Sequence, residues 1–166
     1  MSVSVRTVRL GAVGDGSVGK TSLFFAYTTD AFLTGYIPST FDSSMRNIVV
    51  SDRAVMLQMW DTMGGEDFDR WLPDLKRHCP HAKIILVGTK IDLREDRDML
   101  LRLSQRGKKP ITMEEGEDKA KEIGAELYIE CSSMTQKGVN QLFEEAVKCV
   151  LSKEKRGKKG KKCIIS

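Results

Sequence analysis

The sequence has no long apolar run and lacks the marks of a secreted or disulfide-stapled domain. Its longest uninterrupted aliphatic stretch, Ile84–Val87, is far shorter than the roughly 18 residues of a membrane-spanning helix. The four cysteines are scattered without a CxxC pair, which argues against a disulfide scaffold or a zinc site and favours a reducing compartment. The N-terminal residues lack the basic cluster, apolar block and cleavage site of a secretory signal, so we expect none.

Aromatic residues are scarce at 7%, but 40% hydrophobic and 30% charged residues in a chain of 166 are ordinary for one globular domain. The charge is distributed unevenly. Residues 153–162 hold seven Lys or Arg and one Glu, whereas the rest holds 20 Lys or Arg and 22 Asp or Glu. We therefore expect a domain over residues 1–152 and a polybasic tail over residues 153–166. By itself the tail fits a nucleic-acid arm, a solvated tag or a membrane-surface binder.

Short β-rich runs alternate with helical patterns along the domain. The expected strands lie within residues 5–13, 45–50, 55–60, 83–87 and 127–130, with a hairpin turn at 51–53. The expected helices follow Lys20 and lie within 71–79, 94–109, 112–123 and 139–152. The run at 83–87 is typical of a strand buried on both faces. This alternation predicts an α/β fold with a mostly parallel sheet and helices on both faces.

Residues 14–21 read GDGSVGKT and match the pattern G-x-x-x-x-G-K-[ST] between a predicted strand and a predicted helix. Glycines let backbone N–H groups turn toward phosphate oxygens, and the helix N-terminus adds its positive dipole. Lys20 supplies charge to the outer phosphates, and the Thr21 hydroxyl can ligate Mg²⁺. The fold class is therefore a P-loop NTPase. The expected nucleotide-binding residues here are Gly14, Asp15, Gly16, Ser17, Val18, Gly19, Lys20, Thr21 and Ser22.

A second motif, Thr89-Lys90-Ile91-Asp92, comes directly after the strand expected at 83–87. Open sheets of this kind bind ligands at the carboxyl ends of their strands. The Asp92 carboxylate can accept two hydrogen bonds from guanine, and adenine offers neither in that arrangement. Glu130-Cys131-Ser132-Ser133 follows the next strand and strengthens the interpretation. The pair of motifs favours GTP or GDP over ATP.

With these motifs the sequence resembles a Ras-superfamily small GTPase, and specifically the Rho family. The segments that carry the resemblance are GDGSVGKTSL, YIPSTFD, WDTMGGEDFDR, HCPHAKIILVGTKIDLRED, KEIGAELYIECSSMTQKGV and the terminal CIIS. The charged stretch between Asp92 and Thr112 resembles the insert helix of Rho proteins. The resemblance implies a switch that binds GTP or GDP with Mg²⁺ and meets exchange factors, GTPase-activating proteins, a dissociation inhibitor and effectors in cytoskeletal signalling.

The resemblance also implies roles for single residues. Phe32 would stack on guanine and Tyr36 would close over the phosphates. Ser39 would ligate Mg²⁺ beside Thr21. The remaining roles are the sensing of the γ-phosphate by Asp61 and Gly64, and the framing of the base by Thr89, Lys90, Asp92, Leu93, Ser132 and Ser133.

The C-terminal Cys163-Ile164-Ile165-Ser166 is a prenylation box with Ser last, which favours a farnesyl group. One lipid chain binds membranes only marginally, and the adjoining basic residues supply the second signal. We therefore expect the cytoplasmic face of the plasma membrane, with a cytosolic pool, and no nucleic acid.

Two single positions depart from the family pattern. Gly65 stands where the family has the glutamine that orients the attacking water. We place Gly65 with Lys20 and Gly64 as the catalytic positions and expect slow hydrolysis, because glycine has no side chain to position water. Ser39 stands where the family has threonine, which keeps the hydroxyl and loses a methyl group.

A third departure is a segment of about 30 residues, roughly one βα unit, that is absent after Arg70. We expect the fold to lack one central strand. The 19 residues from Gly65 to Lys83 exceed the ~12 of a parallel crossover, so a five-stranded sheet can close, with the P-loop and base loops then displaced. The missing segment has two explanations, a skipped exon or incomplete gene model on one side and a functional deletion on the other. The sequence also allows a second function, that of a non-cycling module that sequesters exchange factors or prenyl-binding chaperones.

Overall fold

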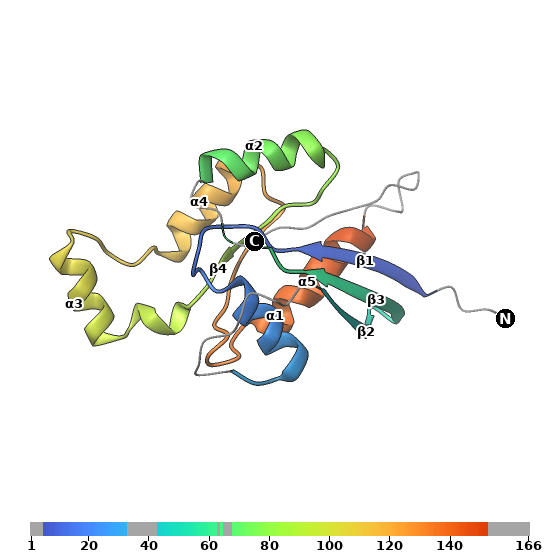
Figure 1. Cartoon of the computed structure of the whole chain (residues 1–166), viewed down its shortest axis with the longest axis horizontal. Coiled ribbons are helices and arrows are strands. Elements are labelled where there is room, and N and C mark those ends of the chain that lie inside the picture. The colour runs from blue at the N-terminus through green and yellow to red at the C-terminus, as the bar shows by residue number, and fades with distance from the viewer. Residues whose placement is uncertain (1–4, 33–42, 63, 65–67, 153–166) are drawn as a thin grey trace.

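The computed structural model describes residues 5–32, 43–62, 64 and 68–152. Its strands are β1 (Arg6–Gly11), β2 (Ser44–Val50), β3 (Arg53–Trp60), β4 (Ile85–Gly88) and β5 (Leu127–Glu130). Its helices are α1 (Lys20–Thr29), α2 (Phe68–His78), the 3₁₀ helix η1 (Ile91–Arg94), α3 (Arg97–Gln105), α4 (Met113–Ile123) and α5 (Val139–Ser152). The predicted strands and helices are confirmed to within a few residues at their ends, and only η1 was not predicted (Figure 1).

The described strands form two separate sheets. In the first, β3 pairs in parallel with β1 and antiparallel with β2, in the order β1-β3-β2. In the second, β4 and β5 pair in parallel. The expected α/β fold with mostly parallel pairing is confirmed. The single five-stranded sheet that the chain length permits is wrong, because within the described residues β1 and β4 do not pair.

Apolar side chains join the two sheets on both faces where backbone hydrogen bonds do not. On one face, the main core cluster combines β1 and β3 with α1, α5 and Ile85 of β4. On the other, Leu72 of α2 packs with Ile84, Ile123 and Val13. α1 and α5 therefore cover one face, and α2 and α4 lie on the opposite side, against β4, β5 and the chain after β1 (Figure 1). Leu72 lies between the segment that follows β1 and the segment that precedes β4. Its packing takes the place of strand pairing between β1 and β4.

The strand at β4 is less buried than its apolar sequence predicts. Ile84 and Ile85 are 9% and 1% exposed, but Leu86 and Val87 are half-buried. Within the described part of the chain, β4 pairs on one edge only, with β5, so part of its surface lacks the neighbour that a central strand would have. The prediction of a strand buried on both faces is therefore right for the first residues and wrong for the last.

The hairpin turn and the helix caps that the sequence predicts are present in the structure. The hairpin between β2 and β3 turns at Ser51 and Asp52, whose φ angles are 49° and 59°, as a two-residue turn of this twist requires. Thr112 and Glu115 form the predicted capping box, and Gly124 ends α4 in the left-handed conformation.

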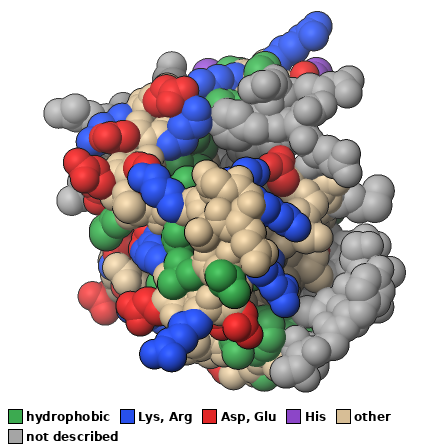
Figure 2. Space-filling view, turned by 90° about the vertical axis from the view of Figure 1, so that its left-hand side faces the viewer, with side chains coloured by type: hydrophobic (Ala, Val, Ile, Leu, Met, Phe, Trp, Pro, Cys, Tyr) green, Lys and Arg blue, Asp and Glu red, His purple; other side chains and the backbone are tan. Residues whose placement is uncertain are grey.

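The surface on the α3 side of the molecule mixes acidic and basic side chains with small apolar areas between them (Figure 2). Among the described residues, no helix is both long enough and apolar enough to traverse a lipid bilayer.

Candidate nucleotide-binding site

The loop between β1 and α1 bends through backbone conformations that favour glycine. Gly14 and Gly19 have φ angles of 153° and 102°, and Gly19 lies directly before α1. Ser17 also has a positive φ, of 61°. Among the residues that the structure describes, no side chain caps the N-terminus of α1. Its first N–H groups are therefore free of the partner that a capping residue would supply, and they are suited to an anion.

Lys20 lies inside the curve of this loop. Its side chain is 6% exposed, and Nζ donates hydrogen bonds to the carbonyl oxygens of Gly14 (2.9 Å) and Asp15 (2.7 Å). Burial lowers the pKa of Lys20, and the carboxylates of Asp61 and Asp15 act in the opposite direction. The ammonium is therefore fixed on the loop, where it can exchange its carbonyl partners for phosphate oxygens.

Thr21 and Asp61 face each other across the site. The Thr21 hydroxyl donates a hydrogen bond to Oδ2 of Asp61, which follows β3. Asp61 Oδ1 is buried, and within the described residues it has no hydrogen-bond partner. A buried unpaired carboxylate oxygen is costly, and hydroxyl and carboxylate oxygens are the ligands that Mg²⁺ prefers. This pair therefore fits a magnesium ion or its bound water.

Gly64 lies against the phosphate loop so closely that no side chain fits. A Cβ built at residue 64 would lie 2.6 Å from the Gly16 Cα, 2.7 Å from the Gly16 nitrogen and 2.9 Å from the Asp15 carbonyl oxygen. Nearby, the Thr62 hydroxyl donates a hydrogen bond of 2.5 Å to the Ala12 carbonyl. Gly64 is thus packed onto the loop, and glycine at this position is a steric requirement.

The two base-recognition motifs meet at the ends of β4 and β5. The Ser132 hydroxyl donates to Asp92 Oδ1, and the Ile91 N–H donates to the Cys131 carbonyl at 3.3 Å. Ser132 is fully buried, and its oxygen also accepts from the Thr135 N–H at 3.1 Å. Within the described residues of η1 and β5, the other carboxylate oxygen, Asp92 Oδ2, has no hydrogen-bond partner. Ser132 fixes the orientation of the Asp92 carboxylate, and the Thr135 N–H in turn holds Ser132 in place.

The base-recognition loop also touches the phosphate loop, although the two belong to different sheets. Lys90 Nζ donates to the Ser17 carbonyl at 2.6 Å, and the Thr89 hydroxyl donates to the Val18 carbonyl at 2.8 Å. The Lys90 Cε also lies 3.6 Å from the position of a Cβ on Gly19. The displacement of these two loops was expected only for a closed five-stranded sheet, which does not form; with the sheet divided, side-chain hydrogen bonds from the loop after β4 join the two loops directly.

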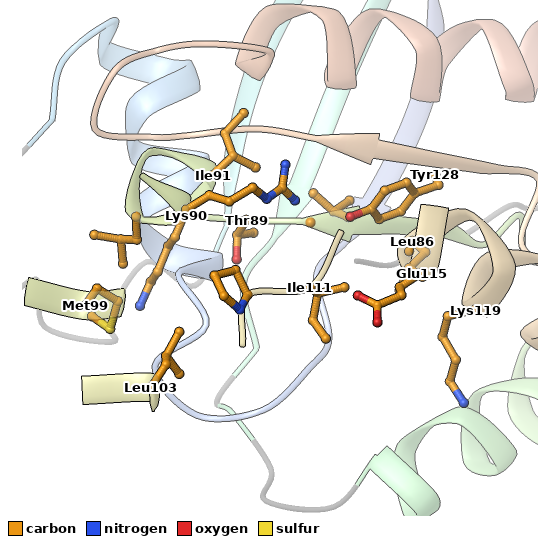
Figure 3. A pocket seen from close by; sticks show the side chains of 16 residues that line it. Leu86, Thr89, Lys90, Ile91, Met99, Leu103, Ile111, Glu115, Lys119 and Tyr128 are labelled. Carbon is orange, nitrogen blue, oxygen red and sulfur yellow. The ribbon is translucent and has the colours of Figure 1, made fainter. Parts of the chain in front are cut away.

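A cavity of about 690 Å³ lies behind the base-recognition loop, between β4, η1, α3 and α4 (Figure 3). Thr89, Lys90 and Leu93 form part of its wall. Met99, Leu103 and Ile111 line the side toward α3 and the following loop (Figure 3). Leu93 therefore lies on the rear of the base loop, lining this cavity.

Three polar residues beside this loop were not predicted as site residues. Arg94, Glu130 and Tyr128 form one hydrogen-bonded cluster. The Arg94 side chain lowers the pKa of Glu130, while burial and the bond to Glu130 raise the pKa of Tyr128 to about 12. The spacing signal was available, since Arg94 lies two residues after Asp92 and Glu130 two before Ser132.

The other predicted residues divide into two groups. In the first group, Phe32 is 37% exposed, and Ser22 and Ser133 are half-buried. Ser22 follows the phosphate loop in the sequence, and Ser133 follows Ser132 of the base-recognition motif. The expectations that fall outside the described residues are those for Tyr36, Ser39, Gly65 and Cys163.

The comparison with known families gives two matches. The family model described as Ras family matches residues 9–70 and residues 68–152. Together the two matches run from β1 to the end of α5 and contain both the phosphate loop and the base-recognition motifs. The two matches meet at residues 68–70, at the start of α2.

Proposed function

This chain belongs to the Ras family of small GTPases, and we propose that it is a Rho-type, membrane-anchored GTP/GDP switch that hydrolyses GTP slowly. Members of this family bind GTP or GDP, as a rule with Mg²⁺. The observation that carries the proposal is the direct contact of the base-recognition loop with the phosphate loop through Lys90 and Thr89. A nucleotide needs both loops at a fixed separation, and these bonds supply it in spite of the divided sheet.

Each group of the site has a distinct part in binding. The N–H groups at the start of α1 and the Lys20 ammonium receive the phosphates. Asp92, oriented by Ser132, accepts hydrogen bonds from the guanine edge. Thr21 and Asp61 are the described groups that would hold Mg²⁺, and the ion, when bound, neutralises charge between the outer phosphates.

Slow hydrolysis follows from position 65. Phosphoryl transfer asks little of the protein beyond positioning and charge stabilisation, and Gly65 has no side chain to hold a water molecule. The Gly65→Gln variant tests this. If single-turnover hydrolysis rises tenfold or more, the absent glutamine is limiting. Strong stimulation of the unmodified chain by an activating protein, with no gain from Gly65→Gln, contradicts slow hydrolysis through this position.

The Rho assignment, its regulators and the cytoskeletal role rest on the quoted motifs, and the membrane role rests on the basic residues 153–162 and the Cys163 box. Cys163→Ser is expected to move the protein from membrane to cytosol in fractionation. Neutralising Lys158, Lys159, Lys161 and Lys162 is expected to weaken binding to anionic vesicles, and the difference from the unmodified chain should be larger at low salt than at high salt. Unchanged fractionation of Cys163→Ser would contradict the anchor.

The proposed loss of a central βα unit has two supports. The two family matches meet at residues 68–70, where the expected gap lies. The described strands also divide between β1 and β4, the neighbours that such a strand would join. Both agree with a chain from which one crossover has been removed.

Titration with fluorescent GDP in the presence of Mg²⁺ tests the nucleotide site. We expect saturable binding that GDP and GTP compete away. ATP should compete at least about tenfold less effectively, because adenine offers Asp92 no hydrogen-bond donor in the same arrangement. ATP competing within tenfold of GTP contradicts the guanine assignment. No binding by a folded chain contradicts the nucleotide site as a whole.

The divided sheet favours a second candidate, a non-cycling module that binds exchange factors or prenyl-binding chaperones without switching. The two candidates differ in one measurement. A switch binds an effector more tightly in its GTP form than in its GDP form. A non-cycling module binds its partners equally in both.

A further inference from the structure

Arg94 and Glu130 form a two-pronged ion pair across the ends of η1 and β5. Arg94 Nη1 donates to Glu130 Oε2 at 2.8 Å and Nη2 donates to Oε1 at 2.6 Å. The two side chains are 34% and 14% exposed. This fork geometry adds directional precision that a single lysine contact lacks, and partial burial weakens its screening by salt.

Tyr128 also contacts the ion pair, at the Glu130 oxygen that accepts from Arg94 Nη2. Its hydroxyl donates to Glu130 Oε1 at 3.0 Å. The ring lies against two glycines, since a Cβ on Gly88 would lie 2.3 Å from the hydroxyl oxygen and a Cβ on Gly116 would lie 2.2 Å from Cζ. β4 and α4 thus each leave out a side chain where this ring packs, and the ring lines the end of the cavity away from Lys90 (Figure 3).

The cluster is only two residues from each base-recognition group. Arg94 and Asp92 belong to the same four-residue 3₁₀ helix, and Ser132 comes two residues after Glu130. Since η1 is one short turn, a displacement of the Arg94 end also tilts Asp92. Two further hydrogen bonds described between these loops are the Ser132–Asp92 bond and the long Ile91–Cys131 bond of 3.3 Å.

We propose that Arg94, Glu130 and Tyr128 are positioning residues for guanine recognition, which fix the direction of the Asp92 carboxylate by clamping η1 to β5. This inference rests on the proposed nucleotide-binding function. It assigns the three residues an effect on base discrimination, separate from any effect on fold stability. β4 and β5 form a sheet of only two strands, so the clamp supplies rigidity that sheet pairing does not.

Inosine diphosphate separates the two effects, because it lacks the exocyclic amine that an aligned Asp92 accepts from GDP. The experiment measures dissociation constants of GDP and inosine diphosphate for the unmodified chain, Glu130→Gln and Tyr128→Phe. Asp118→Asn is the matched control, because it breaks the exposed ion pair with Lys121 on α4 of the same half. Thermal melting of each variant reports folding.

For Glu130→Gln we expect the preference for GDP over inosine diphosphate to fall at least about threefold, with the dissociation constant of GDP rising about tenfold, which corresponds to ~1.4 kcal/mol. Tyr128→Phe keeps the ring and loses one hydrogen bond, so its preference is expected to fall less. The control keeps both constants. If Glu130→Gln does not fold, Tyr128→Phe decides alone.

Equal loss of affinity for both nucleotides, with the preference unchanged, overturns the positioning role and leaves a structural one. Unchanged constants in both clamp variants overturn it as well, and the proposed function stands in either case. Failure of the folded, unmodified chain to bind GDP overturns the proposed function, and this inference with it.

Discussion

The three-stranded and two-stranded sheets are stabilised in different ways. β1 and β3 have six and eight residues, and their inward side chains Val8, Leu10, Val55, Leu57 and Met59 are at most 4% exposed. β4 and β5 have four residues each, and among them only Ile85 is fully buried. A sheet of two short strands is marginal in water, so the second sheet depends on packing and polar contacts from outside itself.

This difference divides the nucleotide site. The phosphate loop and Asp61 follow strands of the well-buried sheet, while Asp92 and Ser132 follow strands of the marginal one. The two halves are joined by the core around α1 and α5, by Leu72, and by the hydrogen bonds of Thr89 and Lys90 to the phosphate loop. A bound nucleotide contacts both halves, and we therefore expect it to act as a further link between them.

The largest expected effect is stabilisation by GDP. At a free concentration of 1,000 times Kd, GDP with Mg²⁺ is expected to add ~4 kcal/mol to the free energy of unfolding. For a chain of this size that corresponds to a rise in Tm of roughly 8–16 °C. Thermal melts check this, with ADP at the same concentration as the control. Hydrogen exchange should show the larger gain in protection at β4 and β5. An equal shift with ADP, or a gain confined to β1 and β3, contradicts the proposed link.

The next effect concerns the packing link on the α2 face. Leu72 is 8% exposed and contacts residues from both halves, so Leu72→Ala is expected to cost ~2–4 kcal/mol of unfolding free energy. Leu101→Ala on α3 is the control, because Leu101 is 60% exposed and its loss should change stability by at most about 0.5 kcal/mol. Urea unfolding measures both. Equal stabilities of the two variants would show that α2 does not join the sheets.

The two halves of the site are also expected to contribute separately to ligand affinity. Asp92→Ala should weaken GDP at least about 100-fold, because two hydrogen bonds to a charged group are lost, and should leave tripolyphosphate binding unchanged. Lys20→Ala should weaken both ligands, because its contacts are to phosphate. Calorimetry with the two ligands measures this. A loss of tripolyphosphate affinity in Asp92→Ala contradicts the separation.

Sequence patterns predicted what depends on neighbours along the chain. The capping box of Thr112 and Glu115, the stop at Gly124 and the hairpin at Ser51 and Asp52 each involve residues at most a few positions apart. The phosphate loop was found in the same way, because its glycines must lie between β1 and α1 for geometric reasons. Family membership then followed from several such motifs in one order.

Contacts between distant segments were not predictable in this way. Lys90 and Ser17 are 73 residues apart, and Arg94 and Glu130 are 36 apart. No periodicity marks either pair, since each depends on how the two sheets lie against each other. The division of the sheet was missed because crossover length allows strand pairing without requiring it, and the packing of Leu72 satisfies the same chain connection.

The smallest expected effect is a pH dependence confined to the two-stranded half. Hydrogen bonds from Arg94 lower the pKa of Glu130 below its ordinary value of 4.5. The stabilisation that the Arg94–Glu130 pair supplies is therefore complete above about pH 4.5, where Glu130 is ionised in the unfolded chain as well. It is lost as the pH falls through the lower pKa of Glu130 in the folded chain.

Glu130→Gln should cost at most about 1 kcal/mol of unfolding free energy at pH 7, because the pair is partly exposed. That difference from the unmodified chain should stay constant down to about pH 5 and shrink below pH 4. Leu72→Ala provides the comparison, since removing an apolar side chain of the interface creates no titrating difference at residue 130. Urea unfolding across pH 3–7 measures both differences. A cost of Glu130→Gln that persists undiminished at pH 3 would mean that the carboxylate charge contributes nothing to the clamp, and that shape and packing alone hold η1 to β5.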